Sequence, residues 1–141
     1  MKRMGLVALV GTVLALSACS AQVLTLDIGT CFDDPAVAGD VAVDDVPIVD
    51  CDTPHDNEVF ANEDLTGDQF PGVEELSNRA DLVCLGAFDA YVGEPYETSI
   101  YEISWLAPSP ETWDVGDREV ICFAFDMNLE KITGSINGIG Q

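Results

Sequence analysis

The stretch from Val49 to Val59 gathers most of the side chains that could do chemistry. It reads Val-Asp-Cys-Asp-Thr-Pro-His-Asp-Asn-Glu-Val and holds a cysteine, the single histidine of the chain and four carboxylates. A histidine beside a carboxylate can serve in acid–base catalysis or as part of a metal site. If the protein were an enzyme, His55 and Asp56 would therefore be the centre of a metal-assisted hydrolase.

A structural role explains the same stretch with fewer assumptions. Pro54 would fix a tight corner, the ring of His55 would donate to a backbone carbonyl, and Asp56 or Asn57 would cap the turn. One histidine is also too few for a zinc site made only of protein ligands, and no G-x-S-x-G motif is present. We therefore predict no catalytic residue, metal or cofactor. The residues of this candidate binding or structural corner are Asp50, Pro54, His55, Asp56 and Glu58.

Arg118 is predicted to join the same corner. It is one of only five basic residues in a chain with 26 acidic ones, so a carboxylate partner is expected. The planar guanidinium group suits a bidentate bond to a carboxylate. We expect that partner to be Asp50, Asp56 or Glu58.

Short strands must hold the corner in place. Residues 46–49 and 58–61 are apolar, β-branched runs on either side of it and are predicted to pair as a hairpin, with Pro47 marking an edge strand. Residues 23–28, 99–105 and 118–125 also have the alternating or apolar pattern of strands.

One helix is predicted over residues 73–91. Its apolar residues recur at spacings of three and four, and Cys84 lies on that apolar face. Most aromatic residues are expected in the core. Trp105 and Trp113 flank a proline-rich loop and are the candidates for an exposed contact surface.

The acidic segment 36–45 is predicted to be an exposed loop or a weak edge hairpin. Its aspartates, with the two just before it, offer the oxygen ligands that calcium prefers, which makes a calcium loop the alternative. The spacing of an EF-hand loop and its closing Glu are missing. The aspartates concerned are Asp33, Asp34, Asp40, Asp44 and Asp45.

The N-terminal residues are typical of an exported lipoprotein. Lys2 and Arg3 precede an apolar run that is too short to span a membrane and ends in Leu16-Ser17-Ala18-Cys19, which looks like a bacterial lipobox. We predict a signal peptide at 1–18, a lipid such as palmitate on Cys19, a short linker at 19–22 and one domain at 23–141. An ordinary signal peptide with a chance cysteine is the alternative.

Removal of residues 1–18 would leave three basic and 26 acidic side chains, a formal charge of −23. Such a protein repels nucleic acid and anionic lipid headgroups, and it attracts cationic partners or divalent ions. We favour the simpler interpretation that acidity keeps the protein soluble, for example at high salt.

Four cysteines would remain besides Cys19, an even number in an exported protein. They allow three disulfide pairings, and none belongs to a C-x-x-C pair. They are Cys31, Cys51, Cys84 and Cys122.

Several of these landmarks together resemble the actinobacterial septum-formation lipoprotein family. They occur in family order, and the most specific is the Cys-x-x-Pro-His-x-x-Glu-Val core at 51–59. The others are Gly-Thr-Cys-Phe-Asp at 29–33, Phe-Pro-Gly at 70–72, Trp113, Gly-Asp-Arg at 116–118 and Gly-Ser-Ile at 134–136. The resemblance implies an extracytoplasmic envelope protein linked to septum formation, and it implies no catalytic mechanism.

The complete prediction is an α+β fold, with a small antiparallel sheet, one main helix on one face and two disulfides. We expect Cys31 to pair with Cys51 and Cys84 with Cys122. The protein would be anchored by its lipid on the outer face of the cell membrane. It would act there as a binding or scaffold domain for an envelope or division protein, not for nucleic acid.

Overall fold

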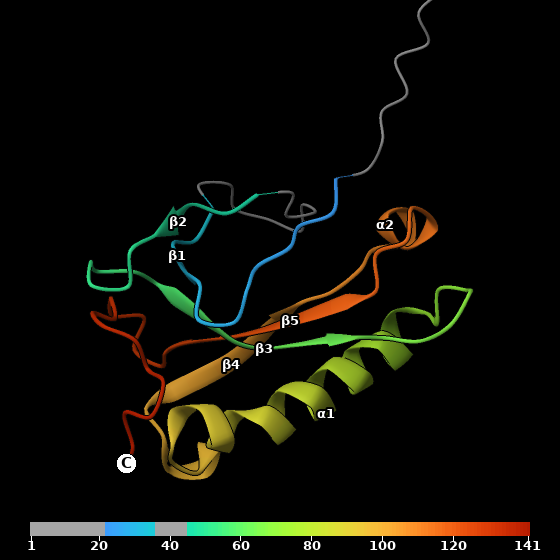
Figure 1. The fold of residues 1–141 in the computed structure, drawn as a ribbon. Helices are drawn as coiled ribbons and strands as arrows, with labels where there is room; N and C mark the ends of the chain where they lie inside the picture. Colours follow the sequence, from blue (N-terminus) through green and yellow to red (C-terminus); the bar gives the residue numbers. More distant parts are fainter. Residues whose placement is uncertain (1–21, 36–44) are drawn as a thin grey trace, which may run out of the picture.

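One antiparallel sheet and one long helix make up most of the protein. The computed structural model describes residues 22–35 and 45–141. Its five strands lie in the order β2-β1-β3-β5-β4, and α1 runs beneath one face of the sheet (Figure 1). The strands are β1 (Cys31–Phe32), β2 (Ile48–Val49), β3 (Asn57–Asp64), β4 (Tyr101–Leu106) and β5 (Glu119–Asp126). The helices are α1 (Val73–Val92), the 3-10 helix η1 (Tyr96–Thr98) and α2 (Pro110–Asp114).

The predicted fold class is confirmed. The helix also has the bounds that its sequence pattern predicts, within one residue. It begins after Gly72 with two glutamates in its first turn, where the helix dipole favours negative charge. It ends at Gly93, which adopts a left-handed φ of 88° that costs glycine little. None of the helices in the described residues is long and apolar enough to cross a membrane.

The larger core lies between α1 and the sheet. The buried residues of α1 recur every fourth position and form one stripe, which faces the inward side chains of β5. The stripe consists of Leu76, Ala80, Cys84, Phe88 and Val92. A disulfide joins Cys84 to Cys122 of β5, and Cys31 is joined to Cys51, so both predicted pairings are confirmed.

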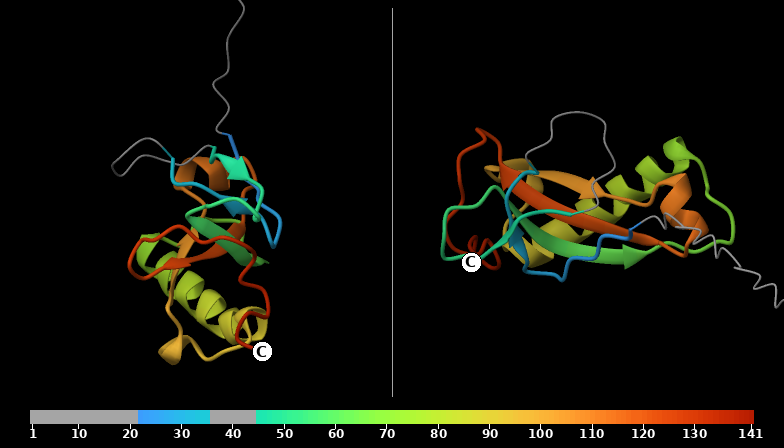
Figure 2. Two further views of the ribbon diagram at one scale, coloured as in Figure 1. Left: turned by 90° about the vertical axis from the view of Figure 1, so that its left-hand side faces the viewer. Right: turned by 90° about the horizontal axis from the view of Figure 1, so that it is seen from above.

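A smaller core lies on the opposite face of the sheet. Leu26, Phe32 and Val46 cover Val59 and Ile121 there. Figure 2 shows the N-terminal segment and α1 on opposite sides of the sheet. The prediction of a strand over 23–28 is wrong, because this segment crosses the sheet face instead of pairing along an edge.

The predicted hairpin of 46–49 with 58–61 is also wrong. The edge strand β2 pairs with β1, and β1 separates it from β3: Cys31 lies opposite both Val49 and Glu58. A strand of two residues carries too weak an alternation to be recognised in the sequence. The edge position predicted for Pro47 fits the observed order.

The two tryptophans are not the exposed surface that we expected. Trp113 is only 2% exposed, lies edge-to-face against Phe70 with ring centroids 5.8 Å apart, and belongs to the larger core. Trp105 is partly buried against the same core, and its indole N–H donates to Asp81 at 2.8 Å. A proline-rich loop does separate them, but Ser109 caps α2 in that loop and turns Trp113 inward.

Arg118 does not bond to the corner, so the predicted carboxylate partner is wrong. Its guanidinium carbon lies 3.9 Å from the ring centroid of Trp113. Its nitrogens donate to the carbonyls of Gly67 at 3.1 Å, Trp113 at 2.8 Å and Asp117 at 2.5 Å. Backbone carbonyls and an aromatic face therefore satisfy the charge in place of a carboxylate.

Several predictions concern residues outside the described ones. They are the signal peptide at 1–18, the lipid on Cys19 and the part of the acidic loop that contains Asp40 and Asp44. Asp45 is exposed, while Asp33 and Asp34 bond to groups within the protein. The division into 1–18, 19–22 and 23–141 stays a prediction.

We predict that Arg118→Gln lowers the free energy of unfolding by about 2 kcal/mol, because charged hydrogen bonds and the stack on Trp113 are lost. Arg79→Gln is the control, since its ion pair with Glu75 is exposed and should contribute under about 1 kcal/mol. Urea unfolding of both variants measures the difference. Equal losses would show that Arg118 is an ordinary surface residue.

Candidate functional site

Asp50 shapes the corner. Its side chain accepts from the backbone N–H of Asp52 at 3.0 Å, and its carbonyl accepts from the backbone and the hydroxyl of Thr53 at 2.9 and 2.7 Å. The predicted capping role of Asp56 or Asn57 is therefore wrong, and Asp50 has that role. An aspartate at the start of a turn bonds two residues ahead with little strain.

His55 is fully buried in the corner. Its Nδ1 lies 2.8 Å from the carbonyl oxygen of Thr53, which confirms the predicted bond to a backbone carbonyl. Its backbone forms a two-way bridge with Ile132, with bonds of 2.9 and 2.8 Å. Nε2 has no hydrogen-bond partner among the described residues, and the side chain has no exposed surface. A substrate in solution has no access to this imidazole.

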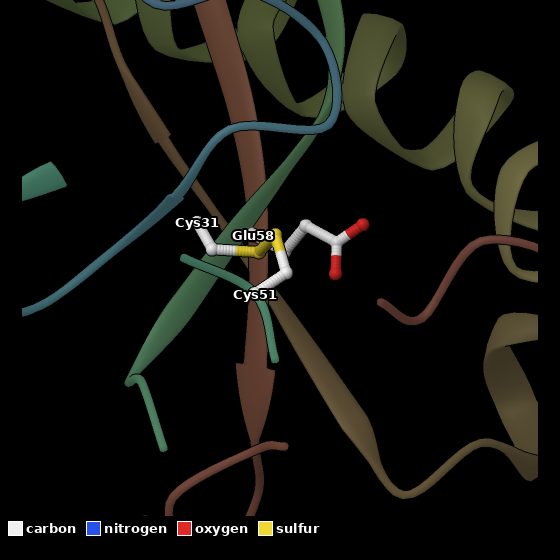
Figure 3. Close-up of side chains that lie close together, drawn as sticks. All are labelled: Cys31, Cys51 and Glu58. Carbon is white, nitrogen blue, oxygen red and sulfur yellow. A yellow bond between two sulfur atoms is a disulfide. The ribbon is translucent and has the colours of Figure 1, made fainter. Parts of the chain in front are cut away.

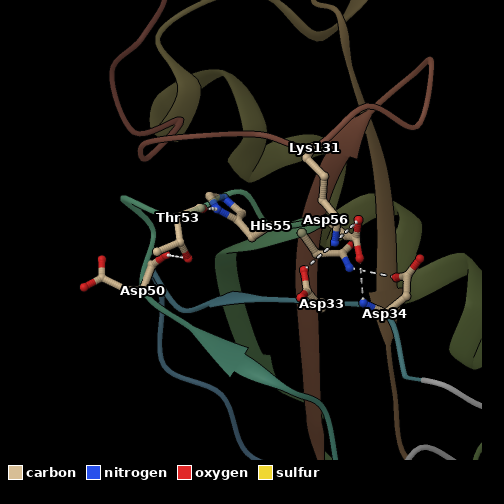
Figure 4. Close-up of polar contacts among 8 residues, drawn as sticks. Asp33, Asp34, Asp50, Thr53, His55, Asp56 and Lys131 are labelled. Carbon is tan, nitrogen blue, oxygen red and sulfur yellow. Dashed lines mark hydrogen bonds and ion pairs between the residues drawn. The ribbon is translucent and has the colours of Figure 1, made fainter.

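Asp56 points away from His55, toward a cluster at the start of β3 (Figure 4). Its carboxylate lies 2.8 Å from the ammonium of Lys131 and accepts from the backbone N–H of Asp34 at 3.0 Å. Lys131 also lies 2.7 Å from Asp33. Burial tends to raise the pKa of Asp56, but the bonds from Lys131 and Asp34 outweigh it and the pKa is lowered. The pair of His55 and Asp56 that a hydrolase would need is not formed.

Glu58 is the other fully buried polar residue of the corner. One carboxylate oxygen accepts from the hydroxyls of Tyr91 at 2.8 Å and Ser135 at 2.6 Å, and the other accepts from the backbone N–H of Ile136 at 2.8 Å. Burial, together with the bond to Glu58, raises the pKa of Tyr91 to about 12. Glu58 thus joins three parts of the chain: β3, the end of α1 and the C-terminal segment.

The disulfide of Cys31 and Cys51 lies beside this carboxylate (Figure 3). These three residues form the only group in the described part of the chain whose ligand atoms are close enough together to hold a metal ion. Both sulfurs are used in the disulfide, and the carboxylate bonds to three donors. The donor set does not fit a metal, and the group is structural.

The predicted corner is therefore a folded unit and not a single site. Asp50 and Pro54 are exposed at the turn, His55 and Glu58 are buried, and Arg118 is bonded near Gly67. A ligand cannot touch these side chains together.

A pocket of about 270 Å³ lies next to the corner, on the face of the sheet opposite α1. Phe123 and Phe125 of β5 provide apolar surface, and Ser104 lies on the neighbouring strand β4. The acidic residues of the lining are Asp34, Asp56, Asp126 and Glu130.

Three of these four carboxylates, all but Asp56, keep an oxygen that has no hydrogen-bond partner among the described residues. Asp56 pairs with Lys131, and Asp34 accepts from the side chain of Asn57 at 2.8 Å. Asp126 accepts only the backbone N–H of Asn128 at 2.7 Å, and Glu130 is exposed with no bond among the described residues. Aromatic faces beside free carboxylates suit an ammonium or guanidinium group with an apolar stem.

This pocket was not predicted from the sequence. One signal was available, because residues 121, 123 and 125 alternate toward the face opposite α1 and an acidic residue, Asp126, ends the strand. The contributions of Asp34 and Asp56 depend on the position of β1 beside β3, which the sequence pattern did not reveal.

We predict that Glu58→Gln lowers the free energy of unfolding by about 2–3 kcal/mol. The new amide would place an N–H group against one of three buried donors, which would then lack an acceptor. Glu130→Gln makes the same chemical change at an exposed position and should cost under about 0.5 kcal/mol. Thermal and urea unfolding compare them, and a neutral Glu58→Gln would contradict the role given to this carboxylate.

Comparison with known proteins agrees with the resemblance described above. The family model for septum formation matches residues 28–138. A protein of Mycobacterium bovis named "Putative lipoprotein LppN" is 31% identical over 115 residues, which cover 79% of this chain and 62% of the relative. The protein of the same name in Mycobacterium tuberculosis matches equally. The chain thus spans about 62% of the length of these relatives, and no solved structure matches it. The chain belongs to the septum-formation family.

Proposed function

We propose that this protein is a lipid-anchored, non-catalytic binding domain of the cell envelope that takes part in septum formation. The family model and the lipoprotein relatives support an envelope lipoprotein. The basic residues, apolar run and lipobox that end at Cys19 support a lipid anchor on the outer face of the membrane.

The observation that carries the binding role is the acidic pocket over Phe123 and Phe125. Its size suits a small group or a single side chain. We infer that the ligand presents a primary amine or guanidinium group on an apolar stem. The stem would lie on the aromatic rings and the cation between Asp126 and Glu130.

A metal-assisted hydrolase at His55 and Asp56 is the less favoured function. It would need the imidazole of His55 at a surface that a substrate can reach, but this side chain is fully buried. It would also need Asp56 beside the imidazole, whereas that carboxylate pairs with Lys131. A non-catalytic role is in better agreement with this geometry.

The pocket is tested with 1,5-diaminopentane as the cationic probe and 1,5-pentanediol as its neutral counterpart. We expect the diamine to shift the NMR resonances of Phe123 and Phe125 and the diol to bind much more weakly. The double change Asp126→Asn with Glu130→Gln should weaken diamine binding by roughly three- to tenfold, since two partly exposed charges are lost. Asp68→Asn with Asp114→Asn removes the same charge at distant exposed positions and is the control. Equal affinities for both probes, or in both double variants, would refute a cation site.

Lipid anchoring is tested by labelling cells with a palmitate analogue. We expect lipid on the wild-type protein and none on Cys19→Ala, which should also appear in the soluble fraction, because the predicted attachment sulfur is gone. Ser20→Ala is the control and should keep its label. Equal labelling of the wild type and Cys19→Ala would show that the lipid is not attached to Cys19.

A further inference from the structure

The outer edge of β3 is open over its C-terminal half. The short strand β1 pairs only with Asn57 and Glu58, and the residues before it bond to Val59. Beyond Val59, β5 occupies the inner edge of β3, and no described residue pairs its backbone with the outer one. The N-terminal segment touches this edge only through the side chain of Asn62, which donates to the carbonyl of Leu26 at 2.6 Å. Figure 2 shows this half of β3 along the rim of the sheet. An open edge can accept an added strand.

The register with β5 identifies the free backbone groups. The N–H of Leu65 donates to Arg118 of the neighbouring chain segment at 2.8 Å. Alternate residues of an antiparallel strand bond to opposite sides, so Glu63 also faces β5, while Asn62 and Asp64 face outward. Neither the N–H nor the carbonyl of these two residues has a hydrogen-bond partner among the described residues. An added strand would satisfy all four groups.

An apolar groove runs along this edge, between β3 and α1. It consists of two adjoining hollows of about 250 and 460 Å³, which share Glu63, Leu82 and Val83. Leu82 of α1 is an apolar side chain that is 74% exposed. Gly86 continues the groove without a side chain to fill it. Apolar side chains of an added strand would therefore find a surface to cover on the α1 side.

The surroundings of the groove are acidic. Glu63 and Asp64 are exposed on β3. Arg79, at one end of the groove, forms an ion pair with Glu75 at 2.7 Å. On the sheet face opposite α1, Asp64 lies across from Glu119. Burial, followed by the charge of Asp64, raises the pKa of Glu119, in agreement with a surplus of negative charge there. The same carboxylates would repel each other if two copies of this chain met edge to edge.

We propose that this edge binds an extended segment of a partner protein in which apolar and basic residues alternate. The backbone of that segment pairs with Asn62 and Asp64. Its apolar side chains cover Leu82 and Val83, and its lysines or arginines face Asp64 on the other side of the sheet. This site is separate from the pocket at Phe123 and Phe125, so a negative binding result at one site would not refute the proposal for the other.

A ten-residue peptide of alternating valine and lysine, blocked at both ends, is the probe. We expect it to bind the ¹⁵N-labelled protein and to slow amide hydrogen exchange of Asn62 and Asp64 at least tenfold. Two control peptides test the mode of binding. In one a central valine becomes proline, which removes a backbone donor and blocks the strand; in the other every lysine becomes glutamate. Both should bind at least tenfold more weakly.

Two protein variants test the groove itself. Leu82→Ala and Asp64→Asn should each weaken binding of the valine–lysine peptide several-fold. Val73→Ala, on the same helix and 70% exposed, and Asp68→Asn are the matched controls and should not change it.

Four outcomes would overturn the proposal. The first is equal binding of the proline peptide, and the second is resonance shifts confined to Phe123 and Phe125, which would show attraction by charge alone. The third is self-association of the protein in analytical ultracentrifugation, together with protection of the Asn62 and Asp64 amides from hydrogen exchange. That result would mean that a second copy of this chain occupies the edge. Absence of binding at millimolar peptide would also refute it.

Discussion

The carboxylate of Glu58 is the constraint on which the rest of the structure depends. A carboxylate without solvent contact is costly unless donors surround it, and here the three donors come from the end of α1 and from the C-terminal segment. The burial of one side chain thus determines where two distant parts of the chain must lie. His55 precedes Glu58 by three residues, so the histidine corner cannot shift along β3 without exposing this carboxylate.

The sequence was informative wherever a pattern repeats over several turns or residues. The stripe of α1 and the apolar run of β5 each cover many positions, and they predicted both elements and the partner of Cys84. The corner was recognisable as well, since proline and aspartate restrict the backbone locally. The bond from His55 to a backbone carbonyl follows from the same local geometry.

What the sequence did not reveal depends on contacts between distant residues. Two paired residues suffice for β1, yet they separate β2 from β3 and bring Asp34 beside Asp56. Arg118 has many carboxylates to choose from, and the capped turn of α2 instead places it on an aromatic ring and three carbonyls. Charge counting could not anticipate this, because a cation can be satisfied by dipoles and π-electrons as well as by an anion.

The order of the two disulfides has a consequence for how the protein matures. The cysteines of the described region bond in chain order, the first to the second and the third to the fourth: Cys31 to Cys51 and Cys84 to Cys122, with separations of 20 and 38 residues. A chain that emerges from a translocation channel N-terminus first presents these thiols in the same order. If the predicted lipid blocks the thiol of Cys19, an oxidant that joins each new thiol to the one still free would produce the native connectivity without reshuffling, and such a chain would need no disulfide isomerase.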